Sequence, residues 1–154
     1  MRKAALILLM CVTSLVAMAE GWEYAPSKAG IQSEHYRLHG YGHQPTALSF
    51  ILVHNDKGEN VVLCILEGEC TIHDFVEGQK YVCISFGDFV QHKYEIKEIT
   101  YKDEQFRAFL VGNADEIIER LKECENFSII VPLYNYGKHT FYFSAVGYPL
   151  YWQY

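Results

Sequence analysis

Between positions 47 and 111, apolar residues come in short runs that alternate with segments rich in turn-forming residues. The intervening segments, among them NDKGEN at 55–60 and EGQK at 77–80, contain the residues that turns require. Turn signals that return about every eight to twelve residues are typical of an antiparallel sandwich or barrel. The runs that predict strands are ALSFILVH (47–54), VVLCIL (61–66), CTIHDFV (70–76), YVCISF (81–86), KYEIKEITY (93–101) and QFRAFLV (105–111).

The segment NADEIIERLKEC has a different period and predicts one helix. Asn113 is a suitable N-cap residue, and Glu116 follows three positions later, as in a capping box. Ile117, Leu121 and Cys124 recur at helical spacing and give the helix one apolar face.

Two further segments complete the predicted architecture. FSIIVPLY, NYG and HTFYFSAV, at residues 127–146, predict a final hairpin, whereas residues 20–45 read mostly as loop with an edge strand near 31–38. The predicted fold class is therefore mainly β, an antiparallel β-sandwich or open barrel with one α-helix near the C-terminal third.

The first nineteen residues have the pattern of a secretory signal peptide. Arg2 and Lys3 are followed by an apolar run that ends near Val16, and Ala17 and Ala19 are the small residues that a signal peptidase reads. A membrane anchor is the alternative, but the run is shorter than the ~20 residues that span a bilayer. We expect cleavage after Ala19, export to the periplasm or outside the cell, and one domain over residues 20–154.

Charge excludes some classes of partner. Removal of Arg2 and Lys3 from 13 basic residues leaves 11 against 19 acidic ones, a formal charge of −8. Nothing in this balance favours nucleic acid or an anionic membrane surface, and no membrane span is expected after signal cleavage. A cationic partner is compatible with the charge but is not implied by it.

Four cysteines would remain in the exported chain, and an even number there favours disulfides over metal or redox chemistry. Cys64 and Cys70 are symmetric about Glu67, so a hairpin turning there would place them in disulfide reach. Cys83 and Cys124 are predicted either to form a second bridge or to be two buried free thiols. No metal or cofactor is predicted from these spacings.

His35, His39 and His43 stand four positions apart, a spacing that would align them on a helix. Gly40 and Pro45 argue against a helix there, so we interpret these residues as histidines of a surface loop. A metal-binding protein or hydrolase that uses this loop is the alternative function. The sequence contains no motif of a catalytic nucleophile or phosphate-binding loop, and we do not predict an enzyme.

The C-terminal segment is rich in aromatic residues. Phe141 and Phe143 fit the predicted core, but the final segment YPLYWQY cannot place every ring inward by alternation. Exposed aromatic residues of this kind are enriched at interfaces, although the tail could instead fold back and cap the sandwich. The predicted binding residues are Tyr136, Tyr148, Tyr151, Trp152 and Tyr154.

The segments GQKYVCISFGD and NADEIIERLKECENFSIIVPLYNYGKHTFYFSAVGYPLYW resemble periplasmic β-sandwich proteins grouped with the invasion-associated locus B proteins and the VasI-type accessory proteins of type VI secretion. The chain departs from that pattern at Cys124 and at Gly147-Tyr148. The resemblance implies a periplasmic β-sandwich with no catalytic residues to assign. We therefore expect an exported, non-enzymatic binding or accessory protein that contacts a protein partner in the envelope or outside the cell, with a structural envelope factor as a further alternative.

Overall fold

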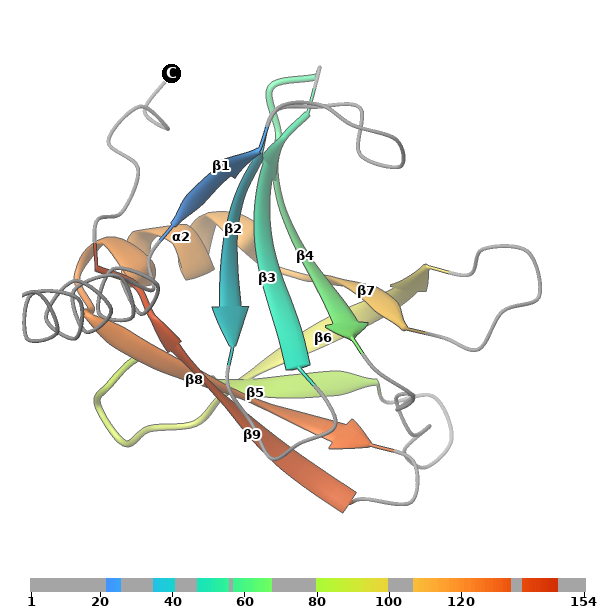
Figure 1. The fold of residues 1–154 in the computed structure, drawn as a ribbon, viewed down its shortest axis with the longest axis vertical. Coiled ribbons are helices and arrows are strands. Elements are labelled where there is room, and N and C mark those ends of the chain that lie inside the picture. Colours follow the sequence, from blue (N-terminus) through green and yellow to red (C-terminus); the bar gives the residue numbers. More distant parts are fainter. Residues whose placement is uncertain are drawn as a thin grey trace, which may run out of the picture.

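The computed structural model describes residues 22–25, 35–40, 47–55, 57–67, 80–99, 107–133 and 137–146, and this part of the chain is mainly β (Figure 1). One helix, α2 (Ala114–Lys122), accompanies the strands, so the predicted fold class is confirmed. The strands are β1 (Glu23–Ala25), β2 (His35–Gly40), β3 (Ala47–His54), β4 (Asn60–Glu67), β5 (Tyr81–Ser85), β6 (His92–Ile99), β7 (Ala108–Val111), β8 (Asn126–Leu133) and β9 (Gly137–Ser144).

The strands form one curled antiparallel sheet in the order β1-β2-β3-β4-β7-β6-β5-β8-β9. The first four strands are paired in chain order, but β4 then pairs with β7, and β5 pairs with β8 as well as with β6. The connection through α2 carries the chain from β7, in the middle of the sheet, to β8 beside β5. β6 pairs with β7, and the predicted final hairpin of β8 and β9 is confirmed.

The curl of the sheet brings Gly40, the last residue of β2, against Phe143 of β9. A Cβ atom on Gly40 would lie only 2.4 Å from Cζ of Phe143, so β2 can approach the Phe143 ring this closely only where a residue has no side chain. Phe143 in turn stacks on Phe127, with ring centroids 4.7 Å apart. The second strand of the sheet, β2, and its last strand, β9, therefore meet around one aromatic cluster.

Buried and partly buried residues alternate along the strands, and the buried side chains form the core on the inner side of the curl. Val62, Cys64 and Leu66 of β4 are buried, and the residues between them are only partly buried. Helix α2 adds its own apolar face, because Ile117, Ile118 and Leu121 are buried in the same cluster. The predicted helical face is thus the one that packs on the core.

The start of α2 differs from the capping box that the sequence predicts. Asn113 precedes the helix as expected, but its backbone is left-handed (φ 57°, ψ 42°) and its side chain makes no capping hydrogen bond. Asparagine tolerates this conformation better than most residues, and its carbonyl accepts a hydrogen bond from the N–H of Ile117 at 3.1 Å. Glu116 is therefore free of a capping role and interacts with Tyr94 and Arg120 instead.

Candidate functional site

Among the described residues, we consider first the outer face of β5, β8 and β9, where rows of small polar side chains lie beside exposed aromatic ones. Strand register aligns Ser85, Ser128 and Tyr142 in one row across the three strands, and Asn126 with Ser144 in the next. Each of them has a buried chain neighbour on the core side, so alternation places these five side chains on the outer face.

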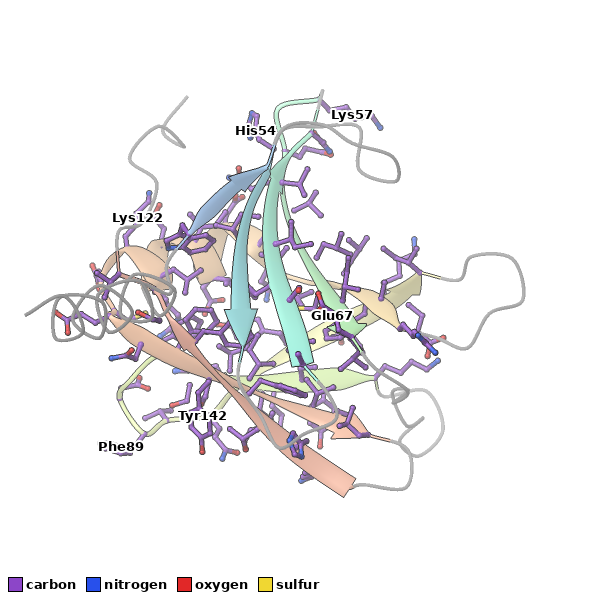
Figure 2. The ribbon with its side chains drawn as sticks, viewed as in Figure 1. His54, Lys57, Glu67, Phe89, Lys122 and Tyr142 are labelled. Atoms are coloured by element: carbon purple, nitrogen blue, oxygen red, sulfur yellow. The ribbon has the colours of Figure 1, made fainter. Side chains whose placement is uncertain are left out.

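The loop between β5 and β6 places a fully exposed aromatic ring beside these rows. Phe89 is 99% exposed and has a positive φ of 59°, a backbone conformation that is rare for bulky residues. Phe89 and Tyr142, itself 63% exposed, both line one open hollow of about 610 Å³. Figure 2 shows the two side chains close together on the same side of the molecule. Ser85, Asn126, Ser128 and Ser144 also line the hollow.

Hydrogen bonds within the loop hold the backbone that carries Phe89. The N–H of Val90 donates to Oδ1 of Asp88 at 3.1 Å, and Oδ2 of Asp88 lies 3.5 Å from Nε2 of His92. The hydrogen bond from Val90, followed by the contact with His92, holds the pKa of Asp88 below its ordinary value. Asp88 is therefore a carboxylate at neutral pH, and its side chain faces His92.

A second set of contacts ties the loop and β6 to helix α2. Nη1 of Arg120 lies 3.4 Å from Nε2 of His92, and Nε of Arg120 donates to Oε1 of Glu116 at 3.0 Å. The hydroxyl of Tyr94 donates to the same Glu116 oxygen at 3.1 Å. Burial, reinforced by this hydrogen bond to Glu116, raises the pKa of Tyr94 to about 12. The loop is thus held in place by both a strand and a helix.

A smaller hollow of about 230 Å³ lies farther along the same outer face. Cys83, Ile130 and Thr140 line it and form the row next to Ser85, Ser128 and Tyr142. Tyr81 and Lys138 also border this hollow, and Nζ of Lys93 lies 5.0 Å above the Tyr81 ring. The two hollows therefore follow each other along β8.

Aromatic, small hydroxyl and amide groups are present in the lining of the two hollows. Serine hydroxyls line the larger one, but neither hollow has a described histidine or carboxylate in its lining that could act as their base. Within the described ranges, no three histidine, cysteine or acidic side chains come together as metal ligands would. Tyrosine, serine and asparagine, which are among the residues of the larger hollow, are also common in the binding loops of antibodies.

The predicted Cys64–Cys70 bridge assumed that β4 pairs with the run that follows it, whereas in the described residues β4 pairs with β3 and β7. Cys64 is a fully buried free thiol whose cross-strand partners are Phe50 on β3 and Phe109 on β7. Both edges of β4 are occupied at Cys64, so no hairpin return can pair with it there. Burial raises the pKa of the Cys64 thiol far above its ordinary value. Cys70 lies outside the described residues.

The alternative of free thiols describes Cys83 and Cys124 in this structure. A bridge would have required α2 to cover the outer face of β5, where Cys83 lies. Helix α2 instead packs on the core side of the sheet, and Cys124 packs against that core with its thiol 3.9 Å from the carbonyl of Leu121. The two sulfur atoms therefore belong to opposite faces of the sheet.

The interpretation of the histidines as a surface loop needs correction. His35 and His39 lie on β2, which pairs with β1 on one side and with β3 on the other. The predicted metal alternative required the spacing of a helix, on which residues four positions apart lie close together. On a strand, the Cα atoms of two such residues are about 13 Å apart, which is too far for the two histidines to share one metal ion. His43 lies outside the described residues.

The predicted aromatic set of Tyr136, Tyr148, Tyr151, Trp152 and Tyr154 also lies outside the described residues. The structure draws attention to Phe89 and Tyr142 instead, which that prediction did not include. Alternation could have identified Tyr142, because it stands between the core residues Phe141 and Phe143. Phe89 had no such signal, since it lies in a turn after Gly87-Asp88.

No helix in the described ranges is long and apolar enough to cross a lipid bilayer. Comparisons with protein-family models, curated proteins and solved structures found no match to this chain. The resemblance to invasion-associated locus B and VasI-type proteins therefore stays a prediction.

Proposed function

We propose that this chain is an exported, non-enzymatic binding protein, and that it contacts a protein partner in the cell envelope or outside the cell through the surface around Phe89 and Tyr142. The observation that carries this proposal is the exposed, left-handed Phe89 at the rim of the larger hollow. Export is supported by residues 1–19 alone.

Phe89 lowers the stability of the fold in two ways. A left-handed backbone costs a non-glycine residue about 1–2 kcal/mol. The exposed ring also forgoes the ~1.5–3 kcal/mol that burial of a large apolar side chain contributes. Asparagine or glycine would relieve the backbone strain at this position. A strained and exposed aromatic residue is therefore explained more readily by contact with a partner than by the fold.

The contacts around Asp88 and Arg120 make the surface suitable for tight binding. They fix the loop before any partner arrives, so less conformational entropy is lost on association. Aromatic residues that are held in place next to a pocket commonly dominate the binding free energy of an interface. A metal protein or hydrolase built on His35 and His39 is not favoured, because both residues lie on β2.

The test is capture of a partner from an envelope extract by the mature protein, followed by calorimetry with the purified partner. Phe89→Asn keeps a residue that tolerates positive φ, and Tyr142→Thr keeps a strand-forming residue. Each change should weaken the measured affinity by at least about tenfold, as expected of a hot-spot aromatic residue. Ile99→Thr is the matched control, because Ile99 is an exposed apolar residue at the other end of β6.

Two results would count against the proposal. Unchanged affinity in both Phe89→Asn and Tyr142→Thr would remove this surface from the function. A mature protein that retains Met1 in cell fractionation and mass measurement would remove the export. If the protein is instead a structural envelope factor, no partner should be captured whose binding is lost in Phe89→Asn or Tyr142→Thr.

A further inference from the structure

The larger hollow on the outer face is lined mainly by apolar atoms. Phe89, Phe127, Tyr142 and Phe143 supply its rings, and no charged side chain is among the described residues that line it. Its volume of about 610 Å³ is within the range of pockets that enclose small ligands, so a side chain as large as tryptophan fits there. A charged group would lose part of its hydration in this hollow without gaining an ion pair. The lining therefore favours an uncharged, aromatic occupant.

The last described residues of the chain lie beside this hollow. Ser144, the final residue of β9, lines it, and the backbone of the next residue, Ala145, is held at both of its polar groups. The N–H of Ala145 donates to the carbonyl of Glu125 at 2.7 Å, and its carbonyl accepts from Nε1 of Trp22 at 3.3 Å. The backbone then turns at Val146, which is 59% exposed. The segment that follows Val146 is therefore attached at a fixed point next to the hollow.

Residues 147–154, with the sequence GYPLYWQY, lie outside the described residues, and their composition suits the hollow. The segment has three tyrosines, one tryptophan, one leucine and no charged side chain. The six residues from Gly147 to Trp152 reach about 20 Å when extended. The hollow spans the three neighbouring strands β9, β8 and β5, which cover about 10 Å. The segment is therefore long enough to turn back and place Trp152 in the hollow.

We infer that residues 147–154, the tail, dock in the larger hollow and compete there with the partner protein. Trp152 is the anchor and lies between Phe89 and Tyr142. The described state, in which Phe89 is 99% exposed, is the open one, and the docked tail covers that ring. This inference rests on the proposed function and adds the regulation of the same site.

Attachment to the domain allows even a weak contact of the tail to compete. A segment joined by a short linker meets its site at an effective concentration of about 1 mM. With a Kd of about 0.5 mM for its own contact, the tail occupies the hollow in about two thirds of the molecules. The apparent affinity of the partner is then about threefold weaker than its affinity for the open hollow.

Fluorine NMR of the mature protein, labelled with fluorotryptophan, tests the docking directly. The chain has two tryptophans, Trp22 and Trp152, and Trp152→Tyr identifies the second signal by its loss. In the wild-type protein the Trp152 signal should be displaced from that of the labelled peptide GYPLYWQY in solution. Phe89→Asn and Tyr142→Thr should each move it at least halfway back to the position of the peptide. The Trp22 signal should stay in place in Phe89→Asn, because Trp22 packs edge-on against Phe50.

Calorimetry with the purified partner measures the competition. Trp152→Ser should tighten the binding of the partner about threefold, because it removes the anchor of the competitor. In the Phe89→Asn background, Trp152→Ser should have no such effect, since the tail no longer docks. Ile99→Thr is the control for both experiments: it removes an exposed apolar side chain at the other end of β6 and should change neither the fluorine signals nor the affinity.

Other outcomes would overturn the inference. One is a Trp152 signal that coincides with that of the free peptide, or that neither Phe89→Asn nor Tyr142→Thr moves. Another is weaker binding of the partner by Trp152→Ser, because the tail would then belong to the contact with the partner. In both cases the proposed function would stand if Phe89→Asn still weakened capture. If Phe89→Asn moved the Trp152 signal but left capture unchanged, the competition and the proposed function would fall together.

Discussion

Substitution of Gly40 by alanine tests whether β2 and β9 meet as described. The added Cβ would lie 2.4 Å from Cζ of Phe143, 2.6 Å from Cε1 and 2.9 Å from Cε2. Ordinary contacts between carbon atoms are about 3.5–4.0 Å, so three ring atoms would have to move by roughly 1 Å. The ring has little room to move, because it stacks on Phe127 and lies edge-on to Phe50.

Overpacking of a filled core typically costs about 1–3 kcal/mol. We place Gly40→Ala near the upper end, at about 3 kcal/mol, because the atoms that clash belong to a ring that is 3% exposed and supported by two other rings. For a domain of this size, that loss lowers Tm by about 10 °C. Urea denaturation followed by circular dichroism measures the free energy of unfolding directly.

A second substitution separates the clash from other effects of alanine. Phe143→Leu removes Cζ and both Cε atoms, which are the atoms that the new Cβ would meet. Alone it should cost about 1.5 kcal/mol, and in that background Gly40→Ala should cost less than about 1 kcal/mol, giving a coupling near 2 kcal/mol. Gly58→Ala is the control: its Cβ would meet no atom within 4 Å, so its cost comes from φ +79° alone and should not depend on Phe143.

The reasoning would be refuted if Gly40→Ala unfolded at the same urea concentration as the wild-type protein. It would be refuted equally if Phe143→Leu did not reduce the cost of the alanine. Either result would mean that β2 and β9 are farther apart than the structure places them.

Three further predictions concern single residues. Phe89→Asn should raise the free energy of unfolding by about 0.5–1 kcal/mol in urea denaturation, because asparagine relieves a left-handed backbone; a loss of stability would contradict the strain assigned to Phe89. Tyr94 keeps its proton to about pH 12 in the folded protein but loses it near pH 10 when unfolded, so stability should be complete below pH 10 and fall by about 2 kcal/mol towards pH 12. Urea denaturation of Tyr94→Phe should lack this fall, and its persistence would assign the fall to another group. Native thiol labelling at pH 8 with peptide mapping should modify Cys83 and leave Cys64 protected until the protein unfolds, since Cys64 is fully buried between Phe50 and Phe109; rapid labelling of Cys64 would place it outside the core.

Local patterns predicted the elements of this fold well. Short apolar runs between turn segments identified β4, β5, β8 and β9, and each of these strands has one face on the core and one face turned outward. The 3.6-residue period identified α2 and its buried face. These signals depend only on which face of an element is buried, and the local order of apolar and polar residues reflects that directly.

The pairing of strands was less accessible, because it depends on residues far apart in the chain. The Cys64–Cys70 prediction assumed that a strand pairs with the run that follows it, but the described part of β4 pairs with β3 and β7. The Cys83–Cys124 bridge assumed a helix on the outer face, and alternation cannot say which face a helix will cover. The same limit applies to the site: alternation reaches Tyr142 on β9, whereas Phe89 lies in a loop that has no period.

The strand order also has a consequence for how the chain reaches its native state. β4 pairs with β7, and β5 pairs with β8, so each of these strands needs a partner that comes much later in the chain. Cys83 can pair with Ile130 only after the segment that forms α2 has been synthesised. Contacts between such distant positions are slow to form, and proteins dominated by them fold in milliseconds to seconds. Until β8 is present, the strand that contains Val82 and Ile84 has one unpaired edge. A second incompletely folded chain can pair with that edge. A chain that stops before Asn126 would keep that edge permanently, so we expect such truncated products to aggregate.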